Sequence, residues 1–447
     1  MQLMIQRTSK VLLGLKRPIV LRSGVAATAQ TLLVNILILG LGVGTGVITA
    51  RVLGPSGRGE QAAIIMVPQF LAYALTLGLP EALVYNLKRY PDRTSQLFSA
   101  ALLLATFMGA VATLVGVLLV PHWLTEYSPA VIRFAQLSTL IAPVSLTALI
   151  LTSALQAREA FALYNAARYL PPLLTLLALI VLALLHRLTP FSAALSYLLP
   201  AVPVLLWMLS RLWKLYRPRW YRLRSASKSL TSYGLRSYGV DLAGTLTYYL
   251  DRVLLVGLVA PATLGLYVVA LSLARMLNVF HAAVVSVLFT KTSGRPVEEV
   301  VALTGLAARA STTLTLLAAM GLTVLGPRVL SLVYGQDYLG AVTVFRLLVL
   351  EVVLSGMAWV LAQAFMALGR PGLVTLLQGV GLSISVPLLL VLVPPYGLEG
   401  AGLALLISAT LRLVLALVSF PLILQMRIPR LWLTRTDIYA IFYREEQ

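Results

Sequence analysis

The sequence predicts an all-α polytopic membrane protein with about 12 transmembrane helices, arranged as two six-helix lobes related by pseudo-two-fold symmetry around a central cavity. Three observations support this fold class. First, 59% of the 447 residues are hydrophobic, only 11% are charged and the mean hydropathy is +0.91, whereas roughly a quarter of the residues in soluble domains are charged. Second, apolar segments of spanning length recur along the whole chain. Third, a weak internal repeat relates its two halves.

Twelve apolar segments are each long enough to cross a bilayer, which takes about 20 residues of helix. They run over residues 24–52, 61–87, 95–120, 131–157, 161–186 and 191–213 in the first half, and 232–258, 263–290, 299–325, 341–368, 372–393 and 398–425 in the second. Turn-forming glycine and proline residues lie between most of them. No connection is long enough to form a soluble domain.

The division of the chain follows from these segments. We expect a basic cytoplasmic segment at 1–23, an N-terminal lobe at 24–215, a cytoplasmic linker at 216–231, a C-terminal lobe at 232–426 and a cytoplasmic tail at 427–447. The first segment has five basic residues between short apolar clusters, which predicts a short amphipathic helix on the inner membrane surface. We interpret it as an uncleaved start of the protein.

The most polar stretch of the chain lies near its middle, at 211–236. It contains eight basic residues and no acidic residue. Interleaved aromatic and basic residues are also typical of nucleic-acid-binding patches. That alternative is excluded here because a spanning segment lies on each side, so the stretch belongs beside the membrane on the cytoplasmic face.

The distribution of lysine and arginine predicts the orientation. With the N-terminus in the cytoplasm, the inner segments hold 23 basic residues and the outer loops hold 4. Because cytoplasmic loops are enriched in Lys and Arg, both termini are predicted to be cytoplasmic. We expect a multi-pass protein of the cell inner (plasma) membrane.

The internal repeat consists of two pairs of similar stretches. RVLGPSGRGEQAA, after the first span, resembles LVGLVAPATLGLYVVA after the seventh, and LQAREAFALYNAARYLPPLL, after the fourth, resembles MALGRPGLVTLLQGVGLSISVPLLL after the tenth. Each half has an even number of spans, so both copies enter the membrane from the same side. Transporters with such parallel repeats bind their substrates between the two halves.

Eight arginines lie within the predicted spans: Arg133, Arg168, Arg236, Arg252, Arg275, Arg309, Arg346 and Arg412. A charged side chain in hydrocarbon costs several kcal/mol unless it faces a wet cavity or a partner. Those near helix ends can reach the interface, as we expect for Arg133, Arg236 and Arg346. Arg275, Arg309 and Arg412 lie near the centres of their spans, which indicates a cavity or, alternatively, structural ion pairs.

Few acidic residues are available to pair with these arginines. Asp241, Asp251 and Glu351 lie within spans and Glu81 lies near an inner helix end, so the interior is predicted to be net cationic. Helical periodicity places Asp241 and Arg252 on one stripe about 16 Å apart, too far for a direct pair. Asp241 and Asp251 are candidates for binding a coupling ion, with structural pairing as the alternative.

Catalytic chemistry has little support in the sequence. The chain has no cysteine and only three scattered histidines, so we expect neither a metal site nor another cofactor. The outer loops carry only dispersed carboxylates, at Glu60, Glu126, Asp337 and Glu399. A membrane glycosyltransferase would need paired carboxylates there. We therefore expect a protein that is not an enzyme.

A motif follows the first span. It consists of Arg51, Gly54, Pro55, Gly57 and Gly59, and the second span then closes on Gly78-Leu79-Pro80-Glu81. With these residues the chain resembles the polysaccharide biosynthesis family of Wzx-type oligosaccharide flippases, within the multidrug/oligosaccharidyl-lipid/polysaccharide exporter superfamily. Residues 248–276 are similar to the family's second-half counterpart. The motif identifies the flippase branch but not the substrate.

The resemblance implies export of undecaprenyl-diphosphate-linked oligosaccharide units from the inner to the outer leaflet by alternating access. Lipid II flippase relatives have fourteen spans, two more than this chain shows. Drug-exporting relatives use acidic residues in the N-terminal lobe, which the first span lacks.

Besides the lipid bilayer, a polysaccharide polymerase and a chain-length protein are the expected partners. We expect a monomer that binds no nucleic acid.

For this substrate we predict Arg275 as the principal diphosphate contact, because arginine presents a planar fork to phosphate oxygens. The secondary candidates are Arg252, Arg309 and Arg412, and Asn35 and Asn278 are placed near the sugars. Two alternatives remain open. One is a multidrug or organic-ion antiporter of the same superfamily, and the other is a non-transporting membrane subunit of a polysaccharide synthase complex.

Overall fold

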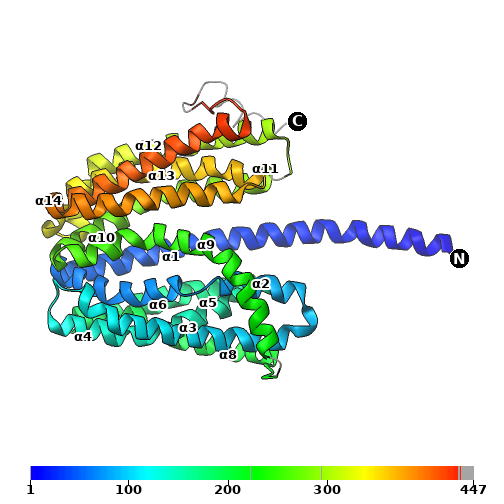
Figure 1. The fold of residues 1–447 in the computed structure, drawn as a ribbon, viewed down its shortest axis with the longest axis horizontal. Coiled ribbons are helices and arrows are strands. Elements are labelled where there is room, and N and C mark those ends of the chain that lie inside the picture. Colours follow the sequence, from blue (N-terminus) through cyan, green and yellow to red (C-terminus); the bar gives the residue numbers. More distant parts are fainter. Residues whose placement is uncertain (1, 222, 293, 431–432, 434–447) are drawn as a thin grey trace.

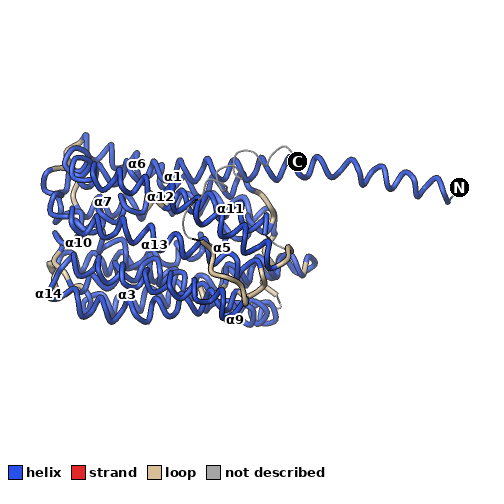
Figure 2. Tube along the Cα trace, turned by 90° about the horizontal axis from the view of Figure 1, so that it is seen from above, coloured by secondary structure: helices blue, strands red, loops and turns tan. Residues whose placement is uncertain are grey.

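The computed structural model describes residues 2–221, 223–292, 294–430 and 433, and within them the chain folds into helices joined by short connections. The first half contains α1 (Gln2–Ala74), α2 (Leu79–Arg89), η1 (Pro91–Arg93), α3 (Thr94–Trp123), α4 (Pro129–Ser138), η2 (Thr139–Ile141), α5 (Ala142–Ala157), α6 (Phe161–Leu184), α7 (Pro190–Leu198) and α8 (Ala201–Tyr216). Figure 2 shows most of the helices lying along one common direction.

The second half repeats this helical pattern. It contains α9 (Leu223–Leu258), α10 (Pro261–Arg275), α11 (Asn278–Thr292), α12 (Val297–Val329), η3 (Leu330–Tyr334), η4 (Gln336–Ala341), α13 (Val342–Ala367), α14 (Pro371–Ser419) and η5 (Phe420–Leu424). The two halves form the two lobes, which Figure 1 shows one above the other.

Eight helical stretches of the described residues are long and apolar enough to cross a membrane, and the pair α10 and α11, bent by 43°, makes a ninth. Two stretches contain a chain turn at a glycine with non-helical backbone, Gly54 in α1 and Gly397 in α14. Each of those stretches is therefore two spans. The remaining span is α9, which is more polar than the others. The predicted fold of twelve spans in two lobes is confirmed.

Gly54 shows why the chain can turn so tightly between the first two spans. Its φ of 64° lies in the left-handed region, where a residue with a Cβ is strained. Pro55 follows immediately, and proline is well suited to the first turn of a helix. In Figure 1 the chain enters along α1 from the N-terminus at the right, turns at the left end and returns towards α2.

The buried apolar residues form three clusters that are not distributed evenly between the lobes. The largest joins both lobes and includes Ala63 and Leu71 from α1 together with Leu264 of α10 and Phe345 of α13. The second lies in the N-terminal half with the first turns of α9, and the third lies in the C-terminal half. The lobes thus share one core in one region and have separate cores elsewhere.

Helix α9 begins within the linker expected at 216–231. It starts at Leu223, and Ala226 and Leu230 are buried in the core of the N-terminal lobe. The hydroxyl of Ser229 donates a 2.6 Å hydrogen bond to Oδ1 of Asn86 in α2. The helix of the seventh span is therefore longer than expected, because its first turns bury apolar side chains in the core of the N-terminal lobe, next to α2. The linker expected at 216–231 is therefore shortened to the connection between the end of α8 at Tyr216 and the start of α9 at Leu223.

The N-terminal segment also differs from expectation. Helix α1 begins at Gln2 and continues without interruption into the first span, so residues 1–23 do not form a separate surface helix. Figure 1 shows this part of α1 extending well beyond the bundle. Of the expected tail at 427–447, all but 427–430 and 433 lie outside the described residues.

Candidate functional site

The C-terminal lobe contains a cavity of about 500 Å³ with charged residues on its wall. The lining side chains come from α9, α10, α11, α13 and α14. Four of them are ionisable: Asp251, Arg275, Glu351 and Arg412. A site between the two lobes was expected, and this cavity lies instead among the helices of one lobe. Its volume is within the range of about 300–1,000 Å³ that is usual for small-ligand sites.

A break in the eighth span places two of the predicted residues on the cavity wall. Arg275 is the last residue of α10 and Asn278 is the first of α11, and the two helices meet at 43°. Both side chains line the cavity. A cation at a helix C-terminus interacts favourably with the helix dipole, which contributes roughly 0.3–1 kcal/mol to holding Arg275 there.

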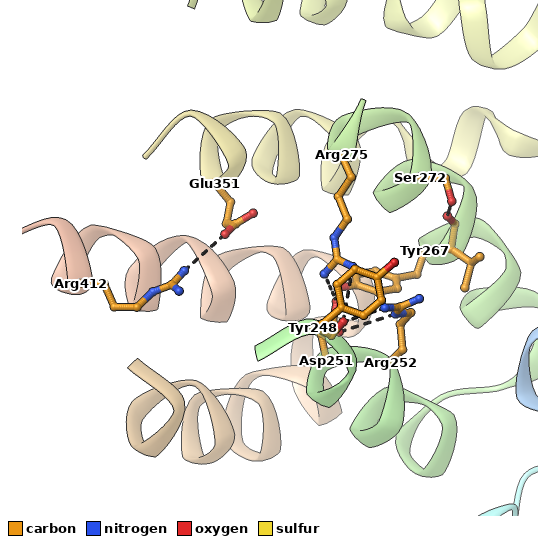
Figure 3. A network of polar contacts seen from close by, with 9 residues as sticks. Tyr248, Asp251, Arg252, Tyr267, Ser272, Arg275, Glu351 and Arg412 are labelled. Atoms are coloured by element: carbon orange, nitrogen blue, oxygen red, sulfur yellow. Dashed lines mark hydrogen bonds and ion pairs between the residues drawn. The ribbon is translucent and has the colours of Figure 1, made fainter. Parts of the chain in front are cut away.

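Asp251 of α9 is the centre of the polar network shown in Figure 3. Nη2 of Arg275 lies 3.4 Å from its Oδ2, and Nε of Arg252 lies 3.8 Å from its Oδ1. The hydroxyl of Tyr267 donates a 2.8 Å hydrogen bond to Oδ2. The side chain of Asp251 is only 3% exposed, so these partners offset the several kcal/mol that burying a lone carboxylate would cost.

Aromatic rings orient the two arginines. The guanidinium of Arg275 lies 4.9 Å from the ring centroid of Tyr248, and that of Arg252 lies 4.7 Å from the same ring. Arg252 also lies 5.1 Å from the ring of Tyr249. Such contacts stabilise a cation without neutralising it, by about 0.5–2 kcal/mol each. The Tyr248 ring is therefore a shared support for both cations.

A second ion pair lies on another part of the cavity wall. Nη2 of Arg412, from α14, is 3.7 Å from Oε1 of Glu351 in α13, and both side chains are largely buried. Figure 3 shows this pair apart from the cluster around Asp251. Two arginines and two acids thus line the cavity, and their formal charges balance. Arg252, which shares Asp251 with Arg275, leaves the whole polar network with one more arginine than carboxylates.

The predicted site residues separate into two groups. Arg275, Arg412, Asn278 and Asp251 line the cavity, and Arg252 adjoins it through Asp251. Arg309, Asn35 and Asp241 do not line it.

The residues outside the cavity have other contacts. Nη1 of Arg309 donates a 3.2 Å hydrogen bond to the carbonyl oxygen of Arg430. Arg430 is the last residue of the described range 294–430. Oδ1 of Asn35 accepts from Arg168 at 2.8 Å inside the N-terminal lobe. Asp241 lies near Glu81 of α2. The stripe on the seventh span that grouped Asp241 with Arg252 therefore does not define one site.

Three residues of the network were not selected from the sequence as site residues: Tyr248, Tyr267 and Glu351. Tyr267 precedes Arg275 by eight residues, about two turns of α10, so helical periodicity could have placed both on one stripe. Glu351 was recognised as a possible partner for an arginine. Its pairing with Arg412 could not be predicted, because it depends on how α13 packs against α14.

A second hollow of about 570 Å³ lies at the ends of α2 and α5. Glu81, Lys88 and Arg89 line it, together with the stacked rings of Tyr85 and Tyr233. Lys88 is already paired with Glu159 at 3.0 Å. This hollow therefore lacks the buried charged groups of the larger cavity.

The motif residues 51–59 lie where α1 turns at Gly54. This turn is far from the second hollow. Arg51, Pro55, Gly57 and Gly59 belong to α1 on either side of that turn. The end of the second span, which carries Glu81, lies at the opposite end of the bundle in Figure 1. The motif is therefore not a single contiguous site.

The fold is similar to several solved transporters. The lipid II flippase MurJ in an inward closed conformation superimposes with a TM-score of 0.76 at 13% sequence identity, over 93% of this chain and 90% of that one. An inward-facing multidrug resistance MATE family transporter of the MOP superfamily gives a TM-score of 0.70 at 15% identity, over 87% and 93%.

A third solved structure is a MOP superfamily transporter from Pyrococcus furiosus. It is described as having a binding pocket of reverse polarity that suggests a different function, and it gives a TM-score of 0.56 at 15% identity over 88% and 94% of the two chains. No curated protein matches the chain. These likenesses show that the chain shares the fold of these solved proteins.

The sequence itself gives the family. Residues 48–343 match the family described as polysaccharide biosynthesis protein. This region includes the motif after the first span and ends at the start of α13, so it extends over parts of both lobes. The chain therefore belongs to the polysaccharide biosynthesis protein family and is a multi-pass membrane protein.

Proposed function

We propose that this protein is a flippase that moves undecaprenyl-diphosphate-linked oligosaccharide repeat units from the inner to the outer leaflet of the cell inner membrane, with both termini in the cytoplasm. Membership of the polysaccharide biosynthesis family supports the sugar-bearing substrate. The likeness to a lipid II flippase supports the lipid-linked form. Alternating access of the two lobes is the proposed transport mechanism.

The observation that carries this proposal is the pair of arginines on the wall of the cavity, Arg275 and Arg412. Close charge-assisted hydrogen bonds between nitrogen and oxygen measure about 2.7–2.9 Å. The ion pairs to Asp251 and Glu351 are longer, at 3.4 and 3.7 Å. Each guanidinium therefore retains donors that are not engaged in a close contact with its carboxylate.

A diphosphate can use those donors. It offers several oxygens and about two negative charges, and arginine binds phosphate through two parallel hydrogen bonds. We infer that the diphosphate approaches Arg275 from the cavity side, while Asp251 keeps Arg252 and Tyr267 as partners. The buried carboxylate then remains partly neutralised when Arg275 turns to the substrate.

Other lining groups suit the sugars adjoining the diphosphate. Asn278, Gln378, Ser385 and Ser408 supply hydrogen-bonding groups, and Trp359 supplies an aromatic surface. These residue types bind hydroxyl groups and the apolar faces of sugar rings. The cavity is sized for the diphosphate and the first sugars of a repeat unit, and the prenyl chain would remain in lipid.

Deletion of the gene tests the function in cells. We expect undecaprenyl-diphosphate-linked repeat units to accumulate on the inner leaflet and surface polysaccharide to be lost. The intact protein should restore both, whereas Arg275→Ala should restore neither. Unchanged surface polysaccharide together with altered drug sensitivity would contradict the proposal and favour the antiporter.

The antiporter is the second candidate because Asp251 and Glu351 also line the cavity. Carboxylates could bind an organic cation in place of the arginines. Transport of a fluorescent cation by reconstituted protein, competed by protons or sodium but not by a prenyl diphosphate, would support this function. If the protein is instead a non-transporting subunit of a polysaccharide synthase complex, the reconstituted protein should transport neither the organic cation nor the lipid-linked sugar.

A further inference from the structure

The family motif lies at a direct contact between the two lobes, away from the charged cavity. Gly59 of α1 and Gly265 of α10 face each other there. A Cβ built on Gly59 would overlap the carbonyl of Pro261 and lie 3.0 Å from the backbone nitrogen of Gly265. A Cβ built on Gly265 would overlap the carbonyl of Pro55 and lie 3.1 Å from the backbone nitrogen of Gly59.

This contact is reciprocal, as a two-fold axis requires. Each glycine follows its proline by four residues, one helical turn, and each meets the proline carbonyl of the other lobe. The two stretches are those related by the internal repeat in the sequence. Glycine at both positions allows the helix backbones to approach closely, as small residues do between membrane helices.

Polar contacts join the lobes at the same end. Arg51 donates from Nε to the carbonyl oxygen of Val333 at 2.8 Å, and its Nη2 donates to that of Leu332. The hydroxyl of Tyr338 donates to the carbonyl oxygen of Ala50 at 3.2 Å. In both contacts a side chain of one lobe binds the backbone of the other at a helix end, where carbonyl groups lack intrahelical partners.

A third polar contact also joins the lobes. Nε1 of Trp123, at the end of α3, donates to the carbonyl oxygen of Val253 in α9 at 2.9 Å. The apolar cluster that includes buried residues of both lobes also surrounds this region. Backbone contact, polar contacts and shared core therefore coincide at the end of the bundle where α1 turns.

We propose that the motif segment 50–59 and its counterpart at 256–265 form the outer gate: a symmetric seal that keeps the cavity closed to the outer side and separates when the lobes rock. Only the assignment of this side as the outer one rests on the proposed function. Arg51 holds the gate closed through its hydrogen bonds to the carbonyl oxygens of Val333 and Leu332. Gly59 and Gly265 allow the close contact between the two helix backbones. The motif is thus assigned to closing the transporter, and substrate recognition is left to the cavity.

The absence of cysteine from the sequence allows a direct test. Ser385→Cys places one thiol on the cavity wall, and a membrane-impermeant maleimide added to the outer face of oriented vesicles reports access to it. Gly59→Ala and Gly265→Ala should each increase the outer labelling rate about tenfold, equivalent to about 1.4 kcal/mol lost from the closed state. Because the contact is reciprocal, the two variants should behave alike.

Gly42→Ala is the matched control, because a Cβ at Gly42 would meet nothing within 4 Å. It should label at the parent rate. Should an alanine at position 59 or 265 impair folding, Arg51→Gln and Tyr338→Phe remove polar contacts without adding volume, and each should also increase outer labelling.

Three results would overturn the proposal: equal labelling of the Gly42, Gly59 and Gly265 variants, an effect at one of the paired glycines only, or increased access from the inner face alone. The labelling requires no substrate. An intact gate in a protein that fails to flip lipid-linked sugars would refute the proposed function and leave this inference standing.

Discussion

Arg275 and Asp251 lie 3.4 Å apart on the wall of the cavity, with the aspartate buried and the arginine open to the cavity. This relationship predicts two separable effects of Arg275→Ala. Transport should fall tenfold or more, since a hydrogen bond to a charged group contributes about 1.5–3 kcal/mol. Stability should also fall, because Asp251 loses a cation.

The second effect can be removed by a compensating substitution. Asp251→Asn combined with Arg275→Ala eliminates the buried charge, so the double variant should recover thermal stability but not flipping. Arg346→Gln is a control, because Arg346 is exposed and does not line the cavity. Recovery of flipping in the double variant would show that Arg275 acts only as a structural partner of Asp251.

The Arg412 and Glu351 pair allows a double-mutant cycle. Each single substitution to glutamine leaves one charge without its partner in a largely buried position, which costs about 3–5 kcal/mol when a pair is fully buried. We expect the double substitution to cost less than the two single ones together. Thermal unfolding of purified protein measures stability, and additive losses would contradict a direct interaction.

Membrane potential should act on the loaded carrier. Moving each of about two substrate charges across 100 mV contributes roughly 2.3 kcal/mol in the outward direction when the inside is negative. Flipping in proteoliposomes should therefore accelerate as the receiving side is made positive. A rate independent of potential would exclude this driving force.

The basic residues around the connection between α8 and α9 should determine how the protein is oriented in the membrane. They should not affect which substrate it transports. Anionic lipid attracts such residues with about 1 kcal/mol each. Replacing Arg217, Arg219 and Arg224 with glutamine should reduce correct insertion, as measured by protease accessibility. A variant that inserts normally but exports a different glycan would contradict this role.

The sequence was informative wherever one span could be considered alone. Apolar length and the repeat predicted the spans and the two lobes, and the depth of Arg275 and Arg412 predicted residues of the cavity. Arg309 and Asn35 lie at similar depths but elsewhere, because depth along a helix does not determine which neighbour a side chain faces. The balance of charge in the cavity depended on the packing of α9, α10, α13 and α14, which periodicity does not encode.

Helix α9 starts in the core of the N-terminal lobe, at Ala226 and Leu230, and ends in the core shared by both lobes, at Val253 and Val256. A single rigid rod fixed at both ends would prevent the lobes from moving relative to each other. Between these anchors lie Gly239 and Gly244, whose added Cβ atoms would meet nothing within 4 Å. Asp251 lies beyond these glycines, next to Val253 in the anchored end of α9, so flexing at Gly239 and Gly244 would let the lobes move while the ion pair between Asp251 and Arg275 stays intact.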